Sequence, residues 1–297
     1  MFYLLTSILF SAGMVLLFKA FEVFKINNLH ALLINYLTAS ILCNIFSANG
    51  AVVFTPFWQQ EWFPLTLFLG VLFINIFYAS AITAQKIAVS VSIVASKMSV
   101  VIPVLFAYYY MDGKLNYITI IGIVGSLLAV YFTVKREEKS RLSGLGNIMF
   151  PLAVFLGSGI VDSSLNYLQH TYMDTSDIND QLGLIFGIAG VCGLGVYMIQ
   201  VINKKQQPFY IKSVIGGIAL GGFNYISTIC LMKALNEKFM EKTVLFPVAN
   251  VGIVALTTVL SILLFKEKLS KQNWLGIILC LIFILLISQS DVIYGYL

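Results

Sequence analysis

The sequence predicts an all-α integral membrane protein in which ten transmembrane helices form two inverted five-helix repeats. Three observations lead to this prediction. Hydrophobic residues make up 59% of the 297 residues and charged residues only 10%, whereas soluble domains carry about 25% charged residues. Apolar stretches near the ~20 residues that cross a bilayer recur along the whole chain. A charged segment near the middle divides these stretches into two sets of five.

The ten expected spans alternate with short polar segments. They cover residues 2–24, 29–48, 63–84, 88–110, 116–134, 147–170, 179–202, 212–235, 242–264 and 272–289. Their apolar composition is too uniform for the alternating strands of a membrane β-barrel. The opening MFYLLTSILF lacks a basic segment and a small-residue cleavage site, so the first span is expected to be a membrane helix rather than a signal peptide.

The charged segment KREEKSRLSG sets the expected domain boundaries. We expect a first half over residues 1–134, a linker over 135–146 and a second half over 147–290. The turns before the last span of each half match, because Lys114, Leu115, Gly122, Ile123 and Leu127 align with Lys268, Leu269, Gly276, Ile277 and Leu281. Since five is odd, equivalent halves of five spans enter the membrane in opposite directions. Inverted repeats of this kind are common in secondary transporters.

The stretch VGIVALTTVLSILLFKEKLSKQNWLGIILCLIFILLI resembles the EamA box of the drug/metabolite transporter superfamily. In that box a G-E-x-L turn precedes the last helix of each repeat. FSAGMVLLFKA and YASAITAQKIAVSVSIVASKMSVVIP resemble two further EamA patterns, and the last two spans look like those of small multidrug resistance proteins. Here Glu267 is kept and Lys266 replaces the glycine, while Asp112 and Gly113 hold the corresponding places in the first half.

Three ionisable residues fall well inside the expected spans, namely Lys19, Lys97 and Asp162. A charge at mid-bilayer costs on the order of 2.5–3.5 kcal/mol on insertion scales. Lys19 lies near the end of its span, where its side chain can reach the interface. Lys97 and Asp162 lie near span centres and are expected to face protein or water. Both are therefore candidate substrate-binding residues.

Polar residues on neighbouring and matching spans complete the candidate site. Ser158, Asp162 and Asn166 are four residues apart and share one helix face. The expected substrate-binding residues are Lys97, Asp162, Asn166, Ser158, Asn75, Tyr78, Asn224 and Asn250. Hydrogen bonding between helices is the alternative role for a single polar residue, at about 0.6 kcal/mol on average. Both charge signs in one cavity would suit a zwitterion, although Lys97 and Asp162 could instead form an ion pair with each other.

Glycines form a second pattern with a different expected role. Gly183 and Gly187 make a G-x-x-x-G motif, and GGIALGG places four glycines between Gly216 and Gly222. Small residues let membrane helices approach closely. We interpret these glycines as packing surfaces rather than ligand contacts.

The pattern as a whole predicts a secondary transporter that moves a small polar metabolite, such as an amino acid, or a drug across the cytoplasmic membrane by alternating access. The resemblance implies a wide substrate range and leaves the direction open. A proton is the candidate coupling ion. A polytopic membrane enzyme or a channel-like protein is the alternative, but no catalytic constellation and no nucleotide-binding loop is present in the sequence. We expect no cofactor, no metal site and no nucleic-acid partner, and a monomer or homodimer in the lipid bilayer.

Basic residues predict the orientation of the chain in the membrane. Most Lys and Arg residues in loops follow odd-numbered spans, including those of the central linker. Because basic loops stay in the cytoplasm, this distribution predicts that both termini lie outside. The resemblance favours the opposite, since many EamA-type proteins are drawn with cytoplasmic termini.

Overall fold

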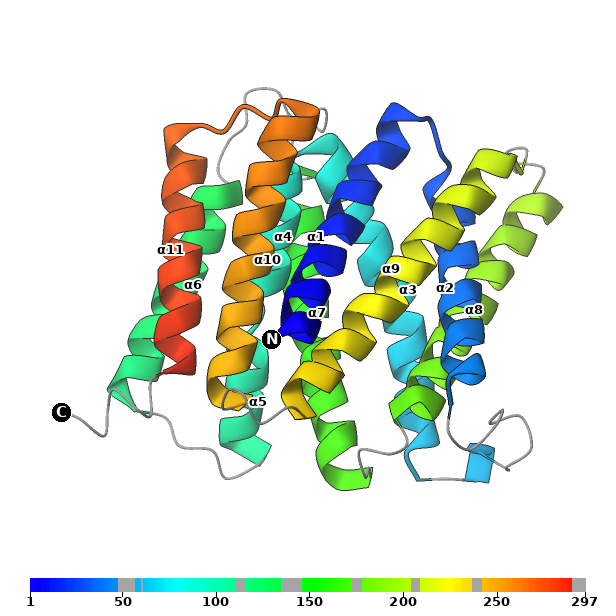
Figure 1. Ribbon diagram of the computed structural model, residues 1–297, viewed down its shortest axis with the longest axis horizontal. Helices are drawn as coiled ribbons and strands as arrows, with labels where there is room; N and C mark the ends of the chain where they lie inside the picture. The colour runs from blue at the N-terminus through cyan, green and yellow to red at the C-terminus, as the bar shows by residue number, and fades with distance from the viewer. Residues whose placement is uncertain are drawn as a thin grey trace. The chain divides into compact units, whose positions relative to one another are not determined.

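The computed structural model describes residues 1–47, 57–59, 61–110, 116–134, 146–172, 178–203, 209–236 and 242–289. Over these ranges the chain forms helices joined by turns, without a strand (Figure 1). The helices are α1 (Phe2–Val23), α2 (Asn28–Ile45), the short η2 (Phe57–Gln59), α3 (Phe63–Lys86), α4 (Val89–Met98), α5 (Val101–Tyr110), α6 (Tyr117–Val134), α7 (Gly146–Tyr172), α8 (Ile178–Ile202), α9 (Ile211–Asn236), α10 (Lys242–Phe265) and α11 (Lys271–Ser288). Helices suit this apolar sequence because lipid offers the backbone no hydrogen-bond partners.

Eight stretches within the described residues are long and apolar enough to cross a membrane. They are Phe2–Val23, Asn28–Ile45, Phe63–Lys86, Val89–Phe106, Ile148–Leu165, Asn179–Ile202, Ile211–Leu231 and Val248–Phe265. Two shorter apolar stretches, Tyr117–Ala129 and Lys271–Ile287, lie where the fifth and tenth spans are expected. The chain is therefore an all-α, multi-pass membrane protein.

The fourth expected span is divided into α4 and α5, and Pro103 explains the division. A proline has no N–H and cannot bond to the carbonyl four residues earlier, which here belongs to Ser99. The N–H of Ile102 donates to that carbonyl instead, at 2.9 Å. The resulting tighter turn lies directly after Lys97, one of the candidate site residues.

Local side-chain contacts set the ends of several helices. Asn27 caps α2 by accepting hydrogen bonds from the N–H groups of Leu29 and His30, at 2.9 and 3.2 Å. Ser270 and Asn273 form a capping box at the start of α11. Lys266 follows α10 with a φ of 52°, a left-handed conformation that glycine adopts most easily.

The chain separates into two compact units that are interleaved along the sequence. Unit 1 contains Met1–Lys19, Ala79–Ile160 and Ile226–Leu297, and unit 2 contains Ala20–Tyr78 and Val161–Tyr225. Helices α4, α5, α6, α10 and α11 belong entirely to unit 1, and α2 and α8 entirely to unit 2. The remaining long helices contribute one part to each unit.

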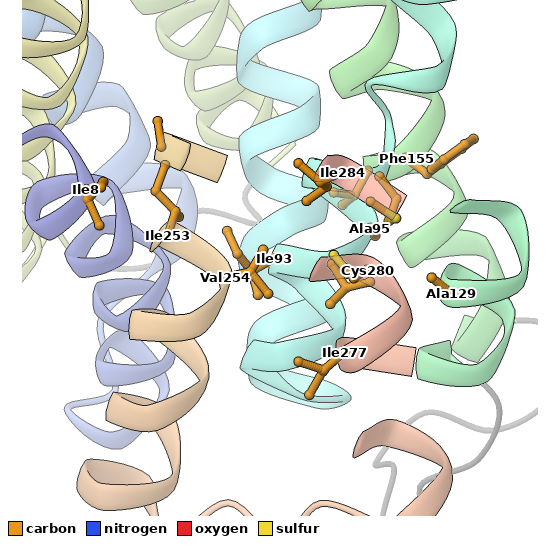
Figure 2. Close-up of a cluster of buried hydrophobic side chains, with 14 of the residues drawn as sticks. Ile8, Ile93, Ala95, Ala129, Phe155, Ile253, Val254, Ile277, Cys280 and Ile284 are labelled. Atoms are coloured by element: carbon orange, nitrogen blue, oxygen red, sulfur yellow. The ribbon is translucent and has the colours of Figure 1, made fainter. Parts of the chain in front are cut away.

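Unit 1 has an apolar core built from helices that are distant in sequence. Figure 2 shows Val254 of α10 beside Ile93 of α4, and Ile253 near Ile8 of α1. Helices α6 and α11 lie side by side (Figure 1). A Cβ atom at Gly122 would lie 2.5 Å from Ile287, and one at Gly125 would lie 2.2 Å from Phe283. Because the partner number falls as the glycine number rises, α6 and α11 are antiparallel.

Unit 2 is organised around α2, which packs against glycines of α8 and α9. On α8, Gly183 faces Cys43, Gly187 faces Ser40 and Gly190 faces Leu37, so α2 and α8 are also antiparallel (Figure 1). The hydroxyl of Ser40 donates to the carbonyl of Gly183 at 2.8 Å. On α9, a Cβ atom at Gly217 would lie 2.5 Å from Cβ of Ile34, and one at Gly221 would lie 2.6 Å from the carbonyl oxygen of Asn35. These glycines therefore pack against α2 within unit 2.

Substituting alanine for Gly221 is expected to destabilise the protein, whereas the same change at Gly222 should not. A Cβ atom at Gly221 would also lie 2.7 Å from Cβ of Thr38, while at Gly222 it would meet nothing within 4 Å. Overpacking of this kind costs typically 1–3 kcal/mol, and alanine in an open helix position is favourable by up to about 1 kcal/mol. Thermal unfolding of the two purified variants in detergent measures the difference. Equal midpoints would contradict this close approach of α9 to α2.

Candidate functional site

Lys97 lies in the last turn of α4, immediately before the break at Ser99. Its side chain is half-buried and interacts electrostatically with Cys280 of α11. The flanking Ser96 is also half-buried, and Ser99 is fully buried. The interrupted helix thus places an ammonium group among hydroxyl groups inside a spanning segment, where polar groups are costly unless they have partners.

Ser158 of α7 lies beside the serines that flank Lys97. The sequence predicted Ser158 as a site residue but did not predict this contact. The hydroxyl of Ser158 donates to the hydroxyl of Ser96, with 3.3 Å between the oxygens. The adjacent Gly159 allows the approach, because a Cβ atom there would lie 2.6 Å from Cβ of Ile102. Two predicted polar groups from different helices, Ser158 and the serines beside Lys97, therefore meet within unit 1.

Asp162 lies one turn further along α7, in unit 2, and its side chain is exposed. It is thus not sealed within the packed core of its own unit. Its expected approach to Lys97, which belongs to unit 1, stays a prediction. The side chain of Asn166, the next member of the predicted stripe, lies outside the described side chains.

The two predicted residues of α3 have exposed side chains in unit 2. Tyr78 is 43% exposed. The amide of Asn75 donates to the carbonyl of Val71 at 2.8 Å, a local bond along the same helix. Since an amide carries two donor hydrogens and a carbonyl acceptor, this bond leaves Asn75 with capacity for a further partner.

The remaining two residues differ in burial. Asn224 of α9 is only 3% exposed, and its amide donates to the amide oxygen of Asn35 on α2 at a long 3.5 Å. This contact is the kind of interhelical bond that the sequence leaves as an alternative role. Asn250 of α10 is half-buried in unit 1.

Glu267 is the residue that the sequence reasoning did not place in the site. It follows α10, and its carboxylate accepts a hydrogen bond from the N–H of Val89 at the start of α4, at 2.8 Å. The residue before α4 is Ala88, which has no side-chain cap to offer. That missing cap, together with a glutamate in the turn after an apolar span, is the sequence signal from which the contact could have been suspected.

Comparison with known proteins gives the chain relatives but does not define its activity. No family model matches it. It is similar to an uncharacterized protein of Haemophilus influenzae, with 27% identity over 224 residues that cover 75% of this chain and 74% of that protein. A solved structure, described only as a crystal structure of a protein, aligns over 96% of this chain and 94% of its own with a TM-score of 0.56. Since the identity is 12%, this likeness concerns the fold alone.

Proposed function

We propose that this protein is a secondary transporter of the EamA type, in which two inverted five-helix halves move a small polar solute across the cytoplasmic membrane by alternating access. The observation that carries the proposal is the pairing of helices that hold equivalent places in the two halves. In this scheme α4 and α5 together are the fourth span, and α7 begins the second half.

Three such pairs pack against each other, namely α2 with α8, α4 with α10 and α6 with α11. The contacts of their glycines make the first and third pairs antiparallel. In the second pair, Ile93 lies beside Val254 of α10, while Val89 contacts Glu267 beyond the end of α10, so these helices also run in opposite directions. Antiparallel packing of equivalent helices is the relation expected from a two-fold axis in the membrane plane.

A matching pair of glycine contacts in unit 2 supports the same relation. A Cβ atom at Gly70 of α3 would lie 2.7 Å from Cβ of Ile188 and 3.1 Å from the carbonyl oxygen of Ile185. At Gly217 of α9 it would lie 2.5 Å from Cβ of Ile34 and 2.6 Å from the carbonyl oxygen of Ala31. In both cases the glycine meets an isoleucine and the carbonyl three residues before it. The third and eighth spans therefore contact the seventh and second in the same way.

The ionisable residues inside the spans support a charged or zwitterionic solute. Lys97 lies at the break in the fourth span, with hydroxyl groups of two helices close by. Asp162 carries the opposite charge on α7. A cation and an anion in one solute path would bind the carboxylate and ammonium of an amino acid by charge-assisted hydrogen bonds. An amino-acid-like metabolite is thus the proposed solute class.

A flux measurement tests this proposal. The purified protein is first screened for thermal stabilisation by amino acids, nucleobases and sugars, and the most stabilising solute is then used in labelled form with proteoliposomes. We expect saturable uptake that an imposed proton gradient accelerates. Flux that does not saturate would favour a channel, and conversion of the solute into a product would favour an enzyme. Either result would contradict a secondary transporter.

A further inference from the structure

The turn between α10 and α11 reaches across to the first turn of α4. The first N–H groups of a helix have no partner within the helix, and Ala88 provides none from its side chain. Glu267 supplies it instead, since its Oε1 accepts from the N–H of Val89 at 2.8 Å. The N–H of Ser90 donates to the same carboxylate. A residue after the midpoint linker thus caps a helix that precedes it, 178 positions away.

The carboxylate lies among polar groups of α1, α3 and α10. Lys19 interacts with it electrostatically, and the ammonium of Lys19 donates to the carbonyl of Gln85 at 2.9 Å. The side-chain amide of Gln85 returns a bond to the carbonyl of Phe18 at 2.7 Å. On α10, the hydroxyl of Ser261 hydrogen-bonds to the carboxylate as well, and its oxygen also lies 2.9 Å from the carbonyl oxygen of Thr258.

Besides Lys19, α1 carries Glu22, whose side chain is half-buried, and the other charged groups of these elements are lysines at their ends. Lys86 ends α3 with a half-buried side chain, and the exposed residues near Glu267 in the turn and at the start of α11 are Lys266, Lys268 and Lys271. The described first turn of α4 and the face of α10 with Ser261 contribute hydroxyl groups and no charge. Lys19 is therefore the described cation whose charge acts on the carboxylate itself.

The two carboxylate oxygens of Glu267 differ in their hydrogen bonding. Oε2 is buried and accepts no hydrogen bond from any residue that the structure describes. The hydroxyl of the neighbouring Ser90 is buried as well, and it too lacks a partner among these residues. An ionised oxygen buried without a donor is costly. A proton on Oε2 removes that charge and leaves Oε1 free to keep the bond from Val89.

Burial acts on the acidity of the carboxyl in the same direction. It raises the pKa of Glu267 above its ordinary value, and the contacts with Ser261, Val89, Lys19 and Ser90 lower the pKa by less than burial raises it. Desolvation thus dominates over the hydrogen bonds and the nearby ammonium. The geometry and the direction of this change both favour a carboxyl that binds a proton when α4 is packed against the turn.

We propose that Glu267 is a proton-binding site that holds α4 against the α10–α11 turn while a proton is on Oε2, and that loss of the proton to water opens this contact. Its role in transport rests on the proposed function. The aligned position in the first half is Gly113, one residue after Asp112, and glycine has no carboxylate. The two ends of an inverted repeat would therefore not carry the same carboxylate at this aligned position.

The sign of the pH dependence follows from linkage. The packed state raises the pKa relative to the open state, in which water surrounds the carboxyl. The packed state is therefore favoured most at a pH below the ordinary carboxyl value, and its advantage is lost as the pH rises through the raised pKa. For each pKa unit by which Glu267 differs between the packed and the open state, the ratio of open to packed protein changes about tenfold over the full titration.

Thiol labelling measures this opening without a transported solute. A cysteine replaces Ser90 in a variant whose four native cysteines are changed to serine or alanine, and the protein in detergent reacts with a water-soluble maleimide at a series of pH values. Ser90 is fully buried, and its hydroxyl has no partner in the described part of the chain, so the substitution removes no observed bond. A second variant with cysteine at the exposed Lys268 provides the reference rate, since thiol reactivity itself rises with pH.

We expect the ratio of the two labelling rates to be low in acid and to rise with pH. Adding Glu267→Gln, which resembles the protonated carboxyl, should keep the ratio low at every pH. Glu61→Gln is the matched control at an exposed glutamate and should leave the rise unchanged. A flat ratio with Glu267 intact, or the same rise with Glu267→Gln, would overturn the proposal. Neither result depends on flux, so a proton-dependent flux with a flat labelling ratio would refute this site and leave the transporter proposal standing.

Discussion

Replacing Asp162 with asparagine is expected to raise the KM for the transported zwitterion about 10- to 100-fold while the proton gradient still accelerates uptake. A hydrogen bond to a charged group contributes about 1.5–3 kcal/mol, and each 1.4 kcal/mol changes binding about tenfold. Asparagine keeps the shape of the side chain but removes the charge that would bind the ammonium of the solute. The exposed position of Asp162 on α7 makes a contact with solute possible without rearrangement of the packed core of unit 2.

Asp180→Asn is the matched control for this prediction. Asp180 lies in the first turn of α8 and accepts a hydrogen bond from Ser47, so the same chemical change falls outside the predicted solute path. Its KM should equal that of the wild type in the same proteoliposome assay. If Asp162→Asn abolished the response to the proton gradient and left the KM unchanged, Asp162 would be the proton carrier and the assignment of that role to Glu267 would be wrong.

Replacing Lys97 with methionine is expected to reduce uptake at low solute concentration at least about 30-fold without lowering the yield of folded protein. Loss of one member of a desolvated charge pair costs about 2–5 kcal/mol. Here the pair is the ammonium of Lys97 and the carboxylate of the solute, so the cost falls on the binding of solute during transport. Methionine also removes the insertion cost of a mid-membrane charge, on the order of 2.5–3.5 kcal/mol. Initial uptake rates and size-exclusion profiles of the purified variant measure the two effects separately.

Lys233→Met is the control for the change from lysine to methionine. Lys233 is exposed in the last turn of α9, where its ammonium lies 5.6 Å from the ring centre of Tyr3, and its loss should leave uptake nearly unchanged. If Lys97→Met transported normally, the predicted contact with solute would be wrong. If its yield fell to a trace while the additional change Asp162→Asn restored it, the two residues would form a structural ion pair rather than a solute site.

The helical fold was predictable because composition alone determines it. In lipid a backbone is satisfied in helices or in closed barrels, and long apolar runs that do not alternate exclude the strands of a barrel. Eight long apolar helices in the described residues confirm the helical expectation. The break in the fourth span was not expected, although Pro103 causes it, because a proline inside an apolar run can either bend a helix or divide it. The number of spans and their inverted arrangement stay predictions that the helix pairing supports.

The candidate site was harder to predict than the fold, and the reason is the range of the contacts. Lys97 and Asp162 stand out in the sequence because a charge in an apolar span is rare. Glu267 does not stand out, since it lies among lysines in a polar turn. Its contact with Val89 joins residues 178 positions apart, and no local pattern encodes such a distance. For Asn224, likewise, an interhelical bond was foreseeable as an alternative role, but its partner Asn35, 189 positions away, was not.

The side of the membrane on which the central linker lies tests the inverted arrangement most directly. Single cysteines inserted directly after Met1, or placed at Lys139 or Leu297, of a cysteine-free variant can be labelled in intact cells with a membrane-impermeant maleimide. Because each half is proposed to cross five times, Lys139 should be protected while Met1 and Leu297 are labelled, in agreement with the basic residues around the linker. Labelling of only Lys139 would keep the inverted halves and reverse the orientation. Equal labelling of Lys139 and Met1 would require an even number of spans between them and would contradict two oppositely inserted halves.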